Sequence, residues 1–169
     1  AKDNGREALD RKIVISKNEV TNENMTLGAQ SGVHFSITKE NGDPTPCKAQ
    51  IIGIEGTTNP KLGPVDRAHG CNDQYHSENG KFSIGLAPGK YNIIVTRGIE
   101  HDHFEKKLEI KKGTFETIQT SLTRSVKTPG WVSTDFHNHS TPSGDNICGT
   151  PDRLINLAAE QIEFAPTTE

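Results

Sequence analysis

The stretch FSIGLAPGKYNIIV, residues 82–95, carries the strongest strand signal in the chain. Apolar side chains alternate with small or polar ones on both sides of the turn sequence Ala87-Pro88-Gly89-Lys90: Phe82, Ile84 and Leu86 before it, and Tyr91, Ile93 and Val95 after it. This period of two predicts a pair of half-buried strands joined by a tight turn, with the two apolar sets facing each other.

The same alternation recurs along the chain. It predicts a hairpin over residues 33–51, in which Asn41-Gly42-Asp43-Pro44 supplies the turn, and two later strands at 104–110 and 114–122. Residues 55–79, rich in Gly, Pro, Asn and Asp, read as one long loop.

Six or seven short strands at even spacing predict a mainly β fold, an immunoglobulin-like or prealbumin-like β-sandwich over residues 30–123. The lead-in at residues 1–29 is polar, apart from Ile13-Val14-Ile15, which could form one strand.

Composition supports this class and removes several others. Hydrophobic residues make up 31% of the chain, and 16 glycines and 9 prolines suit a turn-rich β protein. The net charge of −3 comes without a basic stripe, so we expect no nucleic-acid partner. No apolar run approaches the roughly 20 residues of a membrane helix, so no membrane span is expected. The three cysteines lack CxxC spacing; a single Cys47–Cys71 bridge remains open.

The pattern changes after residue 123. A linker at 124–130 precedes a short strand at 131–136, a polar loop, and a helix with Thr150 as its N-cap and Pro151 in its first turn. Residues 164–169 resemble the start of a second strand. Strand, helix and strand predict a βαβ unit with parallel strands, too small to form a domain alone, so we expect the chain to end inside a second domain.

Two histidines stand at the end of the first of these strands. Residues i and i+2 of a strand point the same way, so His137 and His139 should project from one face, with Asp135 and Asp145 nearby. Imidazole and carboxylate groups suit Zn, Mn or Fe. Spacing alone is weak support, because His101-Asp102-His103 repeats the pair in what reads as a solvated turn.

The run Asp135-Phe136-His137-Asn138-His139-Ser140 resembles the DxHxHS opening of the polymerase-and-histidinol-phosphatase (PHP) superfamily of metal-dependent phosphoesterases. The helix and FAPTTE, residues 164–169, are similar to its next segment, with Glu169 in the place of an Asp. GWVSTDFHNHSTPSGDN, residues 130–146, is most similar to the CehA/McbA-like branch. Members of that branch often carry a carboxypeptidase regulatory-like β module in front, and FSIGLAPGKY resembles a hairpin of such modules.

The resemblance implies a truncated βαβ start of a PHP-type α/β barrel over residues 131–169. It implies metal ligation by His137, His139, Asp145 and Glu169, with Asp135 orienting a histidine, and divalent Zn, Mn or Fe in the complete protein. The implied substrate is a small-molecule ester, most often a phosphoester, with ester or amide hydrolysis as the rival. The family loop reads Ser-Asp-Gly where this chain has Ser143-Gly144-Asp145. With so few ligands, the 169-residue chain itself is expected to be inactive.

A second hypothesis is a non-catalytic β-sandwich that binds carbohydrate or protein. Its best candidate surface is the long loop, which holds His69, Cys71, Asp73 and His76. Few aromatic residues fall at outward strand positions, which disfavours a sugar-stacking platform. The module type and the Ala1 start suggest an extracellular or periplasmic protein, and nothing in the sequence indicates an oligomeric state.

Overall fold

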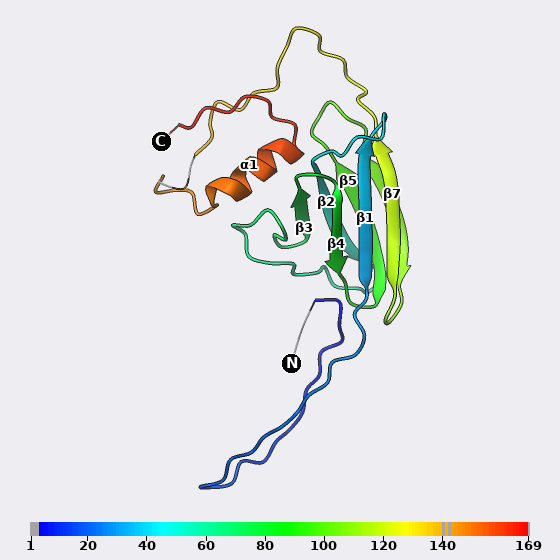
Figure 1. Ribbon diagram of the computed structural model, residues 1–169, viewed down its shortest axis with the longest axis vertical. Coiled ribbons are helices and arrows are strands. Elements are labelled where there is room, and N and C mark those ends of the chain that lie inside the picture. The colour runs from blue at the N-terminus through cyan, green and yellow to red at the C-terminus, as the bar shows by residue number, and fades with distance from the viewer. Residues whose placement is uncertain (1–3, 140, 142, 169) are drawn as a thin grey trace.

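The computed structural model describes residues 4–139, 141 and 143–168, and these form a mainly β protein with one helix (Figure 1). In chain order the elements are β1 (Gly32–Lys39), β2 (Cys47–Ile54), β3 (Gln74–Ser77), β4 (Lys81–Gly85), β5 (Gly89–Thr96), β6 (Phe104–Ile110), β7 (Phe115–Leu122) and α1 (Thr150–Ala159).

The strands form two sheets that enclose one core, as a sandwich requires. One sheet has the order β4-β1-β7 and the other the order β3-β2-β5-β6. Strands β1 and β7 pair in parallel, from Gly32 opposite Phe115 to Lys39 opposite Leu122, and the remaining strand pairs are antiparallel. The predicted β-sandwich is therefore present over residues 30–123.

The core consists largely of residues that the alternation assigned to the inner faces, joined by Ile118 and Leu122 of β7. Each sheet contributes side chains that are at most 4% exposed: Val33, Phe35, Ile37, Ile84, Ile118 and Leu122 from the first sheet, and Cys47, Ala49, Ile51, Tyr91, Ile93, Val95 and Ile110 from the second. Phe82 and Leu108 pack against this cluster while remaining partly exposed. Burial of this apolar set is the main force that holds the two sheets together.

The connections differ from those expected, since both predicted hairpins are wrong. Strands β1 and β2 lie in different sheets, and so do β4 and β5. Each pair is joined by a segment that crosses from one sheet to the other. The cause is physical: a hairpin and a crossover bury the same alternating residues, so the hydrophobic pattern does not distinguish them.

The predicted long loop also contains a strand, β3, which pairs with β2. A tight turn then leads into β4, and Gly80 holds it with φ of +75°. A Cβ atom on Gly80 would lie 2.2 Å from the carbonyl oxygen of Ile37, so only glycine fits this close approach.

Residues 6–30 run out from the sandwich and back as a two-legged arm (Figure 1). Its ends meet where the Ser31 N–H donates to the Gly5 carbonyl at 2.7 Å. Arg11 and Glu23 form an ion pair between the legs. Ile13-Val14-Ile15 lies in this arm, where the structure has no strand, and all three side chains are exposed.

Helix α1 packs against β3 and β2 on the side of the sandwich. Lys48 of β2 forms an ion pair with Glu160 at the helix end, and Asp152 Oδ1 accepts the Ala68 N–H at 2.6 Å. Thr150 was predicted as the N-cap of this helix, but the N-cap is Gly149, one residue earlier, and no side chain caps the helix.

The structure bears on two further expectations. Cys47, Cys71 and Cys148 are free thiols, so the open alternative of a Cys47–Cys71 bridge is not adopted. Within the described part of the chain, no helix combines the length and the apolar character needed to cross a membrane.

Candidate functional site

The two stretches that flank α1 run side by side in parallel. Thr134 bridges Phe164, and Asn138 bridges Thr167. The Asp135 N–H donates to the Phe164 carbonyl at 3.0 Å, and the Thr168 N–H donates to the Asn138 carbonyl at 2.9 Å. The predicted regular strands at 131–136 and 164–169 are reduced to these isolated bridges, because only a few backbone groups pair. The parallel direction across the helix nevertheless matches the βαβ prediction.

Asn138 fixes which way the histidine pair faces. It is 7% exposed, and its Oδ1 accepts a bond from Arg153 Nη1 of α1 at 2.9 Å. Neighbouring side chains of an extended segment alternate in direction, so His137 and His139 point away from the helix side. Neither Asn138 nor Arg153 was identified from the sequence, in which an amide residue between two histidines was the available signal.

The two imidazoles converge on one point. The Nε2 atoms of His137 and His139 lie 3.1 Å apart. Two nitrogens bound to one ion at about 2.0–2.1 Å are separated by about 2.8–3.4 Å for bond angles between square and tetrahedral. The same separation also allows a hydrogen bond from one Nε2–H to the other nitrogen. The pair is therefore arranged either to share a proton or to share a cation.

Ser143 and Asp145 hold the other side of the His139 ring. Its Nδ1 lies 2.9 Å from Ser143 Oγ and 3.1 Å from Asp145 Oδ1, and Ser143 Oγ donates to the same carboxylate oxygen at 2.5 Å. A carboxylate can only accept, so these partners favour a proton on Nδ1 and leave the Nε2 lone pair open. The Ser143 hydroxyl, and then the charge of His139, lower the pKa of the exposed Asp145 carboxyl.

The two described acids contact the histidines in different ways. Asp145 orients His139, a role that the sequence had assigned to Asp135, whereas Asp135 Oδ1 accepts the backbone N–H of His137 at 3.0 Å. Glu169 lies outside the described residues.

Across residues 4–139, 141 and 143–168, no three His, Cys, Asp or Glu side chains gather to hold a metal ion. The two imidazole Nε2 atoms have the right chemistry for a divalent transition metal, but within the described residues they offer two ligands only.

The loop after the histidines is held by its own polar groups. Asn146 Nδ2 donates to the His139 carbonyl at 2.8 Å, and Asn146 Oδ1 accepts the Cys148 N–H at 2.8 Å. These bonds position Ser143 and Asp145 against His139. The PSGDN composition indicated a loop but not these contacts.

The other candidate histidines are placed differently. His101 pairs through its backbone with Arg124, and burial, followed by Arg97 and Arg124, lowers its pKa; His103 is exposed. In the long loop, His69 Nε2 lies 2.8 Å from Glu78 and His76 is 8% exposed. Two of the four residues of the predicted loop surface, His69 and His76, are therefore already paired or buried.

Comparisons with known proteins identify no family for this chain. No family model matches the chain, and no curated protein matches it.

Proposed function

We propose that residues 131–169 are the opening ligand segment of a metal-dependent hydrolase of the PHP type, and that the β-sandwich is a non-catalytic module joined to it. Phosphoester hydrolysis is the leading activity, with ester or amide hydrolysis as the rival. The observation that carries the proposal is the 3.1 Å separation between the Nε2 atoms of His137 and His139.

The tautomer of His139 adds to this support. With Nδ1–H directed to Ser143 and Asp145, the ring presents an unprotonated Nε2 on the side of His137. A histidine ligand whose second nitrogen donates to a carboxylate is the usual arrangement in metal sites, because it fixes the ring and raises its basicity. A divalent ion held there would supply activation of water and charge stabilisation for hydrolysis.

Exposed apolar side chains in the same segment fit the proposal. Six large hydrophobic residues of this segment stand at least half exposed: Trp131, Val132, Phe136, Ile147, Leu154 and Phe164. Such a surface is unusual on a finished domain and suits a βαβ unit covered by further strands and helices of one α/β domain.

The first test is the affinity of the 169-residue chain for Zn²⁺. A four-ligand zinc site contributes about 10–16 kcal/mol, so two ligands should give a dissociation constant of about 1 μM to 0.2 mM for Zn²⁺ by calorimetry. His137→Ala and His139→Ala should each weaken binding by tenfold or more, whereas the matched change His103→Ala should leave it unaltered. Equal loss from His103→Ala would contradict the ligand assignment, and nanomolar binding would contradict the incomplete ligand set.

Activity is tested on the protein as its native gene expresses it. We expect metal-dependent hydrolysis of p-nitrophenyl phosphate that is lost in His137→Ala and retained in His103→Ala. Cleavage of p-nitrophenyl acetate or an anilide instead would select the rival activity. Absence of metal-dependent hydrolysis with all three substrates, alongside full metal loading, would refute the enzymatic proposal.

A further inference from the structure

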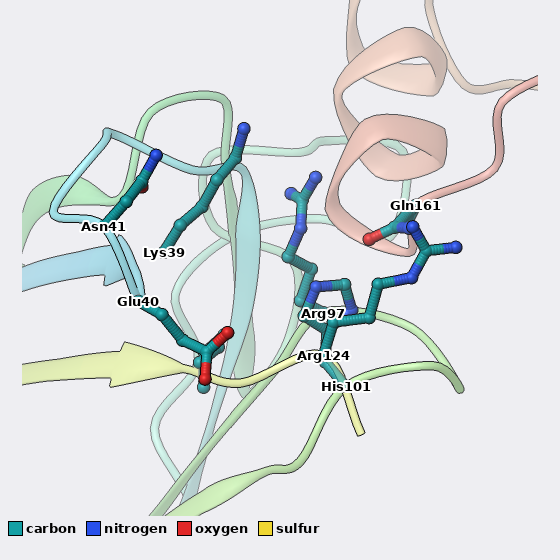
Figure 2. A pocket seen from close by; sticks show the side chains of 8 residues that line it. Lys39, Glu40, Asn41, Arg97, His101, Arg124 and Gln161 are labelled. Carbon is teal, nitrogen blue, oxygen red and sulfur yellow. The ribbon is translucent and has the colours of Figure 1, made fainter. Parts of the chain in front are cut away.

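A cavity of about 400 Å³ lies where the sandwich meets the end of α1. It is lined by Lys39 at the end of β1 and Glu40 after it, by Arg97 after β5, by His101 before β6, by Arg124 after β7 and by Gln161 after α1, among others (Figure 2). We call it the arginine cavity. It shares no residue with the histidine pair, and its volume falls in the range of small-molecule sites.

The arginine cavity has an excess of positive charge. Lys39, Arg97 and Arg124 line it together with one acid, Glu40, whose carboxylate is turned away from the two guanidinium groups (Figure 2). Arg124 is paired with Glu100 at 2.6 Å. Neither Lys39 nor Arg97 has an ion-pair partner among the described residues.

Arg97 is the informative member. It is only partly exposed, and among the described residues its guanidinium donates one hydrogen bond, from Nη1 to the Pro46 carbonyl at 2.7 Å. Burial is the main effect that lowers the pKa of this guanidinium. A half-buried cation without a counter-charge destabilises the fold unless an anion joins it, so Arg97 indicates a partner from outside the chain.

Several polar atoms of the residues that line the cavity are also left without hydrogen bonds among the described residues. Four of its lining residues each carry a buried polar atom without a hydrogen-bond partner in the described part of the chain: Arg97 Nε, His101 Nδ1, Arg124 Nε and Gln161 Oε1. Buried polar atoms in folded proteins are nearly always satisfied by protein, water or ligand. Their concentration on one wall indicates that this place is completed by molecules that bind there.

We propose that the arginine cavity binds a small organic anion through a phosphate or carboxylate group, held by Arg97 and Lys39 and flanked by Arg124 and Gln161. Arginine presents a planar set of donors that matches both oxyanions, and lysine adds a point charge. The proposal does not depend on the metal-site proposal, since different residues carry it.

Such a ligand would connect the sandwich to the C-terminal segment. Gln161 follows α1, while Arg97 and Lys39 belong to the sandwich. The two parts already meet closely beside the cavity: Gly98 has φ of +67°, and a Cβ on it would lie 2.1 Å from the Glu160 carbonyl oxygen. An anion between them would therefore stabilise this junction against opening.

The test is an NMR titration of the ¹⁵N-labelled 169-residue chain with inorganic phosphate, and separately with succinate, at constant ionic strength. We expect saturable amide shifts confined to residues 39–41, 97–101, 124 and 161. Saturation by phosphate alone assigns the site to phosphate groups, and by succinate alone to carboxylates. Shifts that do not saturate with either anion, or that spread over all surface lysines, would overturn the proposal.

Matched variants separate this site from general charge attraction. Arg97→Gln and Lys39→Gln should each weaken binding by roughly tenfold, the loss of one charge-assisted hydrogen bond. Lys111→Gln removes the same charge from an exposed position in the turn after β6 and should change affinity by less than twofold. An equal effect of all three variants would refute the site. Lys39 is exposed, so its variant keeps the test valid should Arg97→Gln fail to fold.

Discussion

The sandwich and the C-terminal segment, residues 131–168, bury their apolar side chains to very different extents. In residues 30–123, only two large hydrophobic side chains are strongly exposed, Val65 and Ile99, whereas the core side chains are at most 4% exposed. In the shorter C-terminal segment, Trp131 is 80% exposed and Phe136 66%, and Ala159 is its one fully buried apolar residue among those described. One region closes its own core and the other does not.

The difference shows what holds each part in place. The sandwich is stabilised by apolar burial, which acts on many residues at once. The C-terminal segment is attached by single polar contacts, such as Lys48–Glu160, Asp152 to the Ala68 N–H, and Gln161 to Glu100. Polar contacts of this kind contribute about 1 kcal/mol each. The segment should therefore depend on the sandwich far more than the sandwich depends on it.

The largest effect should come from truncating a core side chain. Ile93 is fully buried in β5, so Ile93→Ala should lower the free energy of unfolding by about 2–5 kcal/mol, through lost burial and the cavity left behind. Leu154 on α1 is 55% exposed, and Leu154→Ala should change the free energy of unfolding by about 0.5 kcal/mol or less. Urea denaturation measures both. Equal losses would show that the C-terminal segment has a core of its own.

Thiol reactivity should separate the closed core of the sandwich from its surface loops and from the C-terminal segment. Burial in the sandwich raises the pKa of Cys47 to about 12, roughly three pH units above its usual value. At equal pH it therefore holds about a thousandfold less thiolate than an ordinary cysteine. Iodoacetamide at pH 8 should alkylate Cys71 and Cys148 while Cys47 stays unmodified until the protein unfolds, as peptide mass spectrometry would report. Alkylation of Cys47 at a comparable rate in the folded protein would contradict the closed core.

The smallest effect concerns pH. Burial, followed by the charge of Lys48, lowers the pKa of His76 in β3, next to α1. Below about pH 7 the unfolded chain therefore binds more protons than the folded chain. The free energy of unfolding should fall as pH drops from about 7 toward 5. His101, with a pKa lowered in the same direction, adds to this.

Melting temperatures at the two pH values test this expectation. His76→Gln should reduce the pH dependence, while His103→Gln, at an exposed position, should leave it unchanged. A melting temperature that rises between pH 7 and pH 5 would contradict the sign.

Local pattern predicted the sandwich well and its connections poorly. Alternation identified the buried faces of β1, β2 and β5 correctly, because side-chain direction depends only on neighbouring residues. The assignment of β1 and β2 to different sheets, and the parallel pairing of β1 with β7, depend on contacts far apart in the chain. Strand β3 was missed since its four residues, QYHS, lack an apolar alternation.

The candidate site divides in the same way. The common direction of His137 and His139 follows from their spacing, and their Nε2 atoms do meet. The contact of Asp145 with His139 could not be predicted, because it depends on how the loop residues Ser143, Asp145 and Asn146 fold back onto His139. The metal-ligand role of both histidines remains a prediction.

The most direct measurement follows the side-chain nitrogens of the histidines by ¹⁵N NMR while Zn²⁺ is added to the 169-residue chain. The geometry predicts that Nε2 of His137 and Nε2 of His139 shift together, while His139 keeps its proton on Nδ1 beside Ser143 and Asp145. Shifts confined to His101 and His103, or loss of the His139 Nδ1 proton, would contradict the account. So would unchanged rings up to millimolar Zn²⁺, well above the affinity expected of two imidazole ligands.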